Sequence, residues 1–222
     1  MKNIILQHWN GVLGELELKS SESFQAYADK CGAEYKLLRG KPFKSTLGSI
    51  SQKMIMLDEQ WDDYDVVVMV DIDMFTRTGQ TKNIFTDEKG IGRHFGIQNH
   101  LVQSINRQFP LITDPSYPYW GGSCYRLEKD IRKEFRKHLR MNEMIMFDGN
   151  YNDEGIMHRC AILSNFKQKE DIYFDKQQWN YSSFDTGVEN AEFIHIRKKM
   201  YQGGPKVAKL DVYKSLIKRG IV

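Results

Sequence analysis

The sequence predicts an α/β protein in which helices cover both faces of a mostly parallel central sheet, a three-layer α/β/α arrangement. Two observations predict this fold class. The first 73 residues alternate in the order strand, helix, strand, helix, strand, which is typical of parallel sheets built from strand–helix–strand units. Residues 66–70 read Val-Val-Val-Met-Val without a polar interruption, which indicates a central strand buried on both faces.

Length and composition agree with one globular domain. The chain has 222 residues, of which 41% are hydrophobic and 27% charged, enough for an ordinary core. A net charge of +3 is too small to indicate nucleic acid as a partner. The cysteines, three in number and without close spacing, predict reduced thiols. No segment resembles a signal peptide or a membrane span, so we expect a cytoplasmic protein, in whatever cell makes it.

The first four elements follow from local patterns. Residues 3–9 and 33–38 are expected to be strands, and residues 20–32 a helix that Gly32 ends in a left-handed conformation. A second helix is expected over residues 45–61. Apolar residues recur there at steps of three and four, at Leu47, Ile50, Met54, Leu57 and Trp61.

The later elements are less regular. We expect helices over residues 97–108, 128–140, 152–163 and 206–219, and strands over residues 120–127 and 192–197. In the basic helix 128–140, Ile131, Phe135 and Leu139 are expected to face inward. Its cationic residues are expected to form a solvated face: Arg132, Lys133, Arg136, Lys137 and Arg140. In the last helix, the inward residues are expected to be Leu210, Tyr213, Leu216 and Ile217.

Two aspartates directly follow the buried strand. Asp71 and Asp73 are two residues apart, so on an extended chain their side chains point to the same side. Ligands bind beyond the carboxyl ends of strands in open parallel sheets. Paired carboxylates suit Mg²⁺ or Mn²⁺, which would also remove the repulsion between the like charges. The alternative is that both residues only begin a solvated loop.

The stretch "YDVVVMVDIDMF", preceded by "SQKMIMLDE", resembles the D-x-D region of nucleotide-sugar glycosyltransferases with the GT-A fold. Small soluble glycosyltransferases of algal viruses and phages are similar in size. The resemblance implies a single GT-A-like domain over residues 1–222, with a nucleotide-binding half at 1–75 and an acceptor-side half with a basic C-terminal segment at 76–222. It implies a nucleoside-diphosphate sugar as donor, most often a UDP-sugar. The implied acceptor is a glycan or glycoprotein, such as a viral capsid glycan.

The resemblance also implies a metal site and a nucleotide site. Asp71, Asp73 and His195 would hold Mn²⁺ or Mg²⁺; the alternative for His195 is an ordinary core or surface histidine. The loop after the first strand would contact the nucleobase through Gln7, His8 and Trp9, although packing explains Trp9 equally well. Lys198 or Lys206 would reach the diphosphate, within a basic segment that also contains Arg197, Lys199 and Lys209.

Two further pieces resemble the acceptor side of the family. "YWGGSCYRLEKD" would place Trp120, Gly121 and Gly122 against a sugar. Trp120 stands where the family often has Asn, so a sugar contact there would be stacking, and a bulged strand is the alternative. "YNDEGIMHR" would supply Asp153 and Glu154 as a general base or an electrostatic stabiliser. The alternative for these acids is helix capping.

Two other functions are open. The Asp-x-Asp pattern also resembles the start of haloacid-dehalogenase-type phosphatases, in which the first Asp is a nucleophile, but here Phe75 stands where that family has Thr or Val. A non-catalytic module that binds a nucleotide or carbohydrate is the second alternative. Donor hydrolysis separates these hypotheses, because a transferase releases sugar from its donor and a binding module does not.

Overall fold

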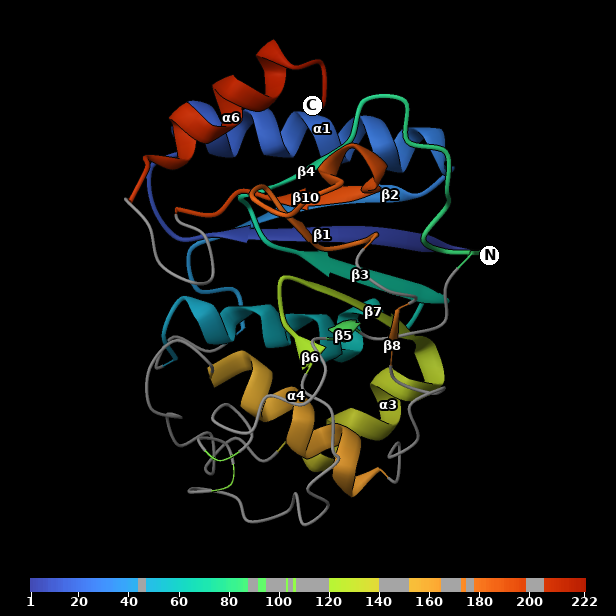
Figure 1. Cartoon of the computed structure of the whole chain (residues 1–222). Coiled ribbons are helices and arrows are strands. Elements are labelled where there is room, and N and C mark those ends of the chain that lie inside the picture. Colours follow the sequence, from blue (N-terminus) through green and yellow to red (C-terminus); the bar gives the residue numbers. More distant parts are fainter. Residues whose placement is uncertain are drawn as a thin grey trace.

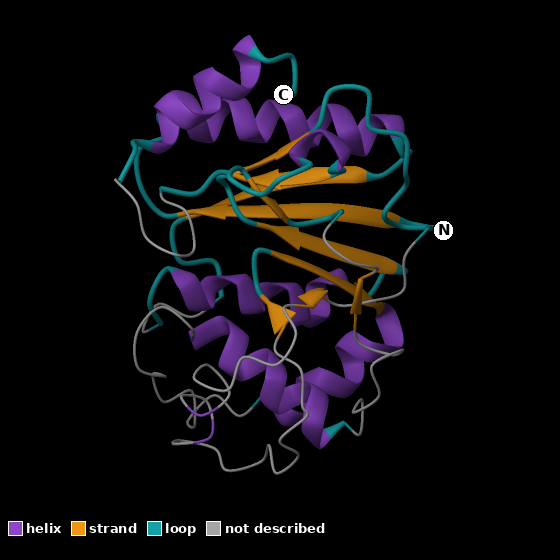
Figure 2. Ribbon diagram, in the orientation of Figure 1, coloured by secondary structure: helices purple, strands orange, loops and turns teal. Residues whose placement is uncertain are grey.

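The structure is a computed structural model that describes residues 1–43, 47–87, 92–94, 103, 106, 120–139, 152–164, 173–174, 178–198 and 206–222. Helices α1 (Glu15–Lys30) and α6 (Lys209–Lys218) lie on one side of the strands. Helices α3 (Lys129–His138) and α4 (Asn152–Leu163) lie on the other (Figures 1 and 2). The predicted three-layer α/β/α fold is therefore confirmed.

The central sheet has four strands in the order β2-β1-β3-β7. Strands β1 (Asn3–Trp9), β2 (Glu34–Arg39) and β3 (Val66–Val70) are parallel, and β7 (Cys124–Glu128) runs antiparallel to β3. Every residue of β3 is buried, as the apolar run predicts. The carboxyl ends of the parallel strands therefore meet at one edge of the sheet.

Alternate residues of β3 pack into two different cores. Val67 and Met69 face the core shared with α3 and α4, whereas Val66, Val68 and Val70 face the core shared with α1. This alternation follows from the two-residue period of an extended strand. A strand that supplies both cores needs apolar residues at every position, which is why the run has no polar interruption.

Two smaller sheets complete the described strands. One has the order β4-β10-β9, with β4 (Met74–Thr76), β9 (Tyr181–Ser182) and β10 (Phe193–His195). The other has the order β6-β5-β8, with β5 (Gly92–His94), β6 (Trp120–Gly121) and β8 (Tyr173–Phe174). Because β4 begins three residues after Asp71 and pairs with β10, Met74 lies opposite His195.

The predicted helix over residues 45–61 is wrong in type. Two 3₁₀ segments, η1 (Ile50–Leu57) and η2 (Glu59–Trp61), replace it. Asp58 separates them because its backbone is extended and its side chain accepts a hydrogen bond from the Gln60 amide. The expected inward residues Met54, Leu57 and Trp61 are buried, but Ile50 is 37% exposed. Ile55 and Met56 are also buried, although they do not lie on the predicted inward face of an α-helix.

Two other boundaries differ from the prediction. Helix α1 begins at Glu15, five residues early, because Glu17 accepts a hydrogen bond from the Gly14 amide and starts the helix there. The predicted strand over residues 120–127 divides into β6 and β7, with Gly122 and Ser123 between them. The predicted left-handed conformation of Gly32 is confirmed, with φ of +66°. Most of the helix predicted over residues 97–108 lies outside the described residues.

Two predictions are wrong: Arg132 was expected to be exposed, and Ile217 was expected to be buried. Arg132 is fully buried in the basic helix instead of lying on its solvated face. Its guanidinium donates to the carbonyl oxygens of Leu127 at 2.9 Å, Trp61 at 2.9 Å and Tyr64 at 2.6 Å. In α6, Ile217 is 46% exposed, and Val212 is buried in its place. Tyr213 faces inward as predicted and stacks on Phe75.

The three cysteines are free thiols. Among the described residues, no helix combines the length and the apolar character that crossing a membrane requires.

Replacing Arg132 should destabilise the fold. Arg132→Met removes the donor that serves three buried carbonyl groups, and unsatisfied buried acceptors are costly. We expect a loss of about 2–3 kcal/mol in the free energy of unfolding, measured by urea denaturation. Lys133→Met, at the exposed neighbouring position, is the control and should change stability by less than about 0.5 kcal/mol. Equal effects of the two substitutions would contradict the role of Arg132.

Candidate active site at the carboxyl edge of the sheet

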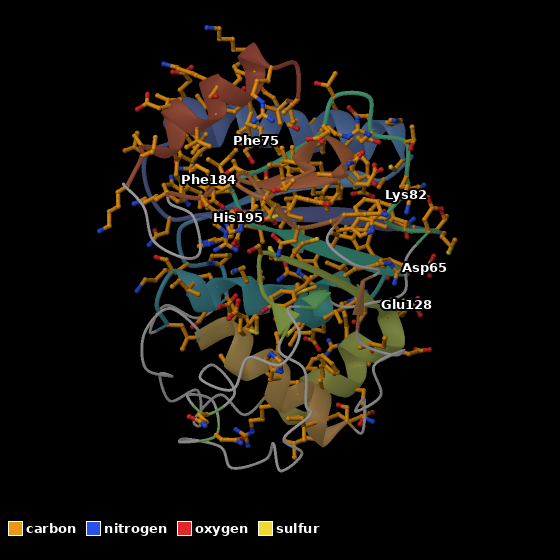
Figure 3. All side chains as sticks on the ribbon, viewed as in Figure 1. Asp65, Phe75, Lys82, Glu128, Phe184 and His195 are labelled. Atoms are coloured by element: carbon orange, nitrogen blue, oxygen red, sulfur yellow. The ribbon has the colours of Figure 1, made fainter. Side chains whose placement is uncertain are left out.

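A cleft of about 610 Å³ opens at the carboxyl edge of the central sheet. His195 lies at this end of the molecule, whereas Asp65, just before β3, lies at the opposite end (Figure 3). Six segments line the cleft: residues 8–10, 49–53, 70–73, 122–123, 153–154, and 195 with 197. A cleft built from segments this far apart in sequence exists only in the folded protein.

Three of the predicted site residues converge in this cleft. Asp71, Asp73 and His195 each have one potential metal-ligand atom, and these three atoms lie within 4.8 Å of one another. The backbone fixes their places: the Asp71 amide donates to the Ser123 carbonyl at 2.8 Å, and the Ile196 amide donates to the Asp73 carbonyl at 2.9 Å. Two carboxylates and an imidazole at this spacing are donors that suit Mn²⁺ or Mg²⁺.

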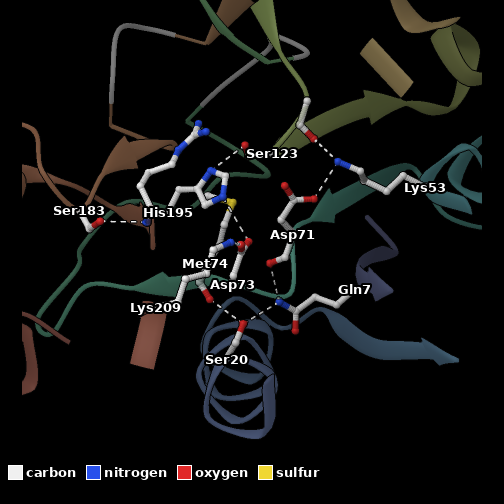
Figure 4. A network of polar contacts seen from close by, with 12 residues as sticks. Gln7, Ser20, Lys53, Asp71, Asp73, Met74, Ser123, Ser183, His195 and Lys209 are labelled. Atoms are coloured by element: carbon white, nitrogen blue, oxygen red, sulfur yellow. Dashed lines mark hydrogen bonds and ion pairs between the residues drawn. The ribbon is translucent and has the colours of Figure 1, made fainter. Parts of the chain in front are cut away.

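The His195 ring is held from both sides. Its Nδ1 lies 2.8 Å from the Ser123 hydroxyl, and its Nε2 lies 3.2 Å from Oδ1 of Asp73 (Figure 4). Lys209, the first residue of α6, forms an ion pair with the other oxygen of Asp73. Burial works against the charge of Asp73, but His195 and Lys209 outweigh it and lower the pKa of this carboxyl. Asp73 is therefore ionised throughout the neutral range.

Lys53 connects the two acidic parts of the cleft. Its ammonium lies 2.7 Å from Asp71 and 2.7 Å from Asp153, and it donates to the Gly122 carbonyl at 3.0 Å. Burial opposes this charge, but the attraction of Asp153 and Asp71 outweighs it and raises the pKa of Lys53. The site prediction omitted Lys53, although it is the lone cation in the apolar stretch 50–57.

Asp153 and Glu154 lie in the first turn of α4 and line the same cleft. Glu154 Oε1 accepts a hydrogen bond from the Gly122 amide at 2.8 Å, and its buried Oε2 has no hydrogen-bond partner among the described residues. Burial raises the pKa of Glu154 to about 7. Burial also raises the pKa of Asp153, although Lys53 opposes the effect.

Gly122 permits this close packing. A β-carbon at this position would lie 2.3 Å from the Tyr125 hydroxyl and 2.7 Å from Oδ2 of Asp153. Any side chain would therefore displace the Tyr125 and Asp153 side chains that pack against Gly122. The backbone at Gly122 therefore approaches other parts of the protein closely on the wall of the cleft, and its predicted approach to a sugar stays a prediction.

The three residues predicted in a loop after the first strand, Gln7, His8 and Trp9, instead form the end of β1. His8 and Trp9 line the cleft. The His8 ring bonds the Gly40 carbonyl at 2.6 Å, and Trp9 Nε1 donates to the Val12 carbonyl at 2.9 Å. Gln7 is fully buried instead: its amide donates to Ser20 and to the Asp71 carbonyl, and it accepts from Tyr35. The structure thus places Gln7 beneath the aspartate turn.

Among the residues whose side chains the structure describes, Gly121, Lys198 and Lys206 do not line the cleft. Gly121 is buried in β6, and the side chain of Trp120 lies outside the described part of the chain. Lys198 and Lys206 are exposed, and the segment 199–205 between them is not described. Arg197 does line the cleft, two residues after His195.

The whole chain was then compared with known proteins. No protein-family model matches it, and no curated protein sequence matches it. Solved structures do match in fold. One is a glycosyltransferase involved in the glycosylation of the major capsid of PBCV-1, with a TM-score of 0.58 and 13% identity over 98% of this chain and 100% of that one.

Two more solved structures share the fold. The galactosyltransferase LgtC, in complex with donor and acceptor sugar analogues, has a TM-score of 0.53 and 11% identity over 91% of this chain and 88% of that one. The bifunctional glycosyltransferase WbbM has a TM-score of 0.54 and 10% identity over 92% of this chain and 46% of that one. The GT-A fold that the sequence predicts is therefore confirmed.

The raised pKa of Glu154 predicts a pH dependence of stability. The folded protein binds this proton more tightly than the unfolded chain, whose glutamate pKa is near 4.5. The stabilisation is complete below about pH 4.5 and is lost as the pH rises toward about 7, by at most about 3 kcal/mol. The free energy of unfolding of the wild type, minus that of Glu154→Gln, should fall over this range in urea titrations.

Glu59→Gln removes an exposed carboxylate and is the control for the loss of one charge. A difference between wild type and Glu154→Gln that stays constant from pH 4.5 to 7.5 would contradict the buried state of Glu154.

Proposed function

We propose that this protein is a metal-dependent glycosyltransferase that moves a sugar from a nucleoside-diphosphate sugar to a glycan or glycoprotein acceptor. The observation that carries the proposal is the convergence of Asp71, Asp73 and His195 in one cleft with Asp153 and Glu154. The shared fold with glycosyltransferases supports it. A UDP-sugar is the favoured donor, and a viral capsid glycan is one acceptor that the first of these neighbours suggests.

The residues fit a divalent cation. The donor set is two carboxylates and an imidazole, on side chains that are 25%, 16% and 8% exposed. They are thus buried enough to be held in place and open enough for phosphate oxygens to complete the coordination. When bound, Mn²⁺ or Mg²⁺ would neutralise the charge that develops on the diphosphate leaving group. Asp71, Asp73 and His195 would hold it.

The chain also supplies cations for the diphosphate. Lys209 already reaches Asp73, and Arg197 lines the cleft. We therefore propose that these two residues face the phosphates, with Lys198 and Lys206 as outer contacts from the basic segment. Fixed positive charges stabilise a departing diphosphate without reorganisation during the reaction. His8 and Trp9 would contact the nucleobase, and residues 1–75 would form the nucleotide-binding half of a single domain.

The acid pair would act on the acceptor side. Glu154 has a buried oxygen that no described residue contacts by a hydrogen bond, and its pKa is about 7, so it can accept a proton from an acceptor hydroxyl at neutral pH. Asp153 is held by Lys53 and would supply negative charge next to the sugar as positive charge develops on it. Gly122, which lines the cleft, would border the acceptor sugar, with Trp120 and Gly121 directly before it in β6.

Replacing Asp73 should abolish metal-dependent nucleotide binding. We expect Asp73→Ala to bind UDP equally weakly with and without Mn²⁺. The substitution removes one of the three proposed metal ligands and the contact that another of them, His195, makes. Isothermal titration calorimetry with UDP, at fixed Mn²⁺ or with a chelator, measures this. Asp63→Ala, at an exposed acid before β3, is the control. A UDP affinity of Asp73→Ala that still rises with Mn²⁺ would refute the metal role.

Donor turnover tests the function itself. With Mn²⁺ and a panel of UDP-sugars, the wild type should release UDP and free sugar slowly in equal amounts when no acceptor is present. Asp153→Asn and Glu154→Gln should bind UDP like the wild type and turn over the donor about a hundredfold more slowly. Binding of UDP without any release would indicate a non-catalytic module. Phosphate release from a generic ester would indicate a phosphatase.

A further inference from the structure

We infer that Ser123 is a positioning residue that orients His195 for the divalent cation. The inference rests on the proposed function, because it concerns the same cation. The Ser123 hydroxyl contacts Nδ1 of His195 at 2.8 Å, which leaves Nε2 directed at Asp73 at 3.2 Å (Figure 4). A histidine that binds a metal through one nitrogen needs a partner on the other nitrogen to fix the ring.

Ser123 itself is held firmly. It is 7% exposed and lies between β6 and β7. Its carbonyl accepts the hydrogen bond of the Asp71 amide at 2.8 Å. One residue therefore touches two of the three proposed metal ligands, Asp71 through its backbone and His195 through its side chain. A displacement of Ser123 would move both ligands together.

The hydroxyl group suits this task because it can both donate and accept. Asp73 as a carboxylate only accepts, so a neutral His195 ring that makes both contacts carries its proton on Nε2 and accepts from Ser123. A cation at Nε2 needs the lone pair of that nitrogen. The proton then sits on Nδ1 and is donated to the Ser123 oxygen. A carbonyl or carboxylate at this position could serve only the second arrangement.

Removing the hydroxyl should weaken cation binding. We expect Ser123→Ala to bind Mn²⁺ about tenfold more weakly than the wild type, measured by calorimetry or by the electron paramagnetic resonance signal of free Mn²⁺. Ser183→Ala is the matched control. Ser183 is equally buried and bonds the backbone of Arg197 and His195, but not the His195 ring. Its Mn²⁺ affinity should stay at the wild-type value.

Nitrogen-15 spectra of histidine in the wild type provide a readout that does not depend on the Ser123→Ala variant. The His195 signals, assigned with a His195→Gln variant, should show a proton on Nε2 without metal and a proton on Nδ1 alone with diamagnetic Mg²⁺. If the wild type binds Mn²⁺ and Ser123→Ala binds it equally well, or if the proton stays on Nε2 with Mg²⁺, the inference is overturned. If the wild type binds neither cation, the proposed function fails as well.

Discussion

The site depends on one lysine that neutralises two carboxylates, the partly buried Asp71 and the buried Asp153. Carboxylates removed from water cost several kcal/mol each unless a cation is close to them. Lys53 bridges Asp71 and Asp153 at 2.7 Å each and also bonds the Gly122 carbonyl. It thereby joins the end of β3, the start of α4 and the strand edge, three segments that local sequence does not connect. Without that charge, Asp71 and Asp153 would repel each other across the cleft wall.

The turn from Asp71 to Asp73 has a second, topological role. It ends β3 in the central sheet and begins β4 in the next one, so the chain passes between two sheets within three residues. Because β4 pairs with β10, His195 is brought next to acids more than 120 positions earlier in the chain. Gln7, buried under the turn, binds the Asp71 carbonyl and fixes its height above the sheet. The geometry of the site is thus a consequence of strand pairing.

This dependence on pairing explains what the sequence could and could not predict. The run 66–70 and the acids after it were predictable, because burial on both faces and strand polarity are local properties. His195 was found through a family resemblance, since no spacing relates it to Asp73. Ser123 was not predicted, because its role exists only where two strands meet. Arg132 was misjudged because its partners are carbonyl groups, which a pattern of side chains does not reveal.

Under the proposed function, the charges of the cleft favour the binding of a divalent cation together with a diphosphate. Three carboxylates, Asp71, Asp73 and Asp153, stand with three cations, Lys53, Lys209 and Arg197. A divalent cation alone would add two positive charges beside Lys209, and a diphosphate alone would add negative charge beside the acids. Either ligand alone leaves more uncompensated charge than the two together, and such charge is costly where water is partly excluded. Together they nearly cancel, and Lys209 can then exchange Asp73 for a phosphate oxygen. Under the proposed function, the electrostatics that stabilise this part of the fold therefore favour joint binding of metal and nucleotide over binding of either one.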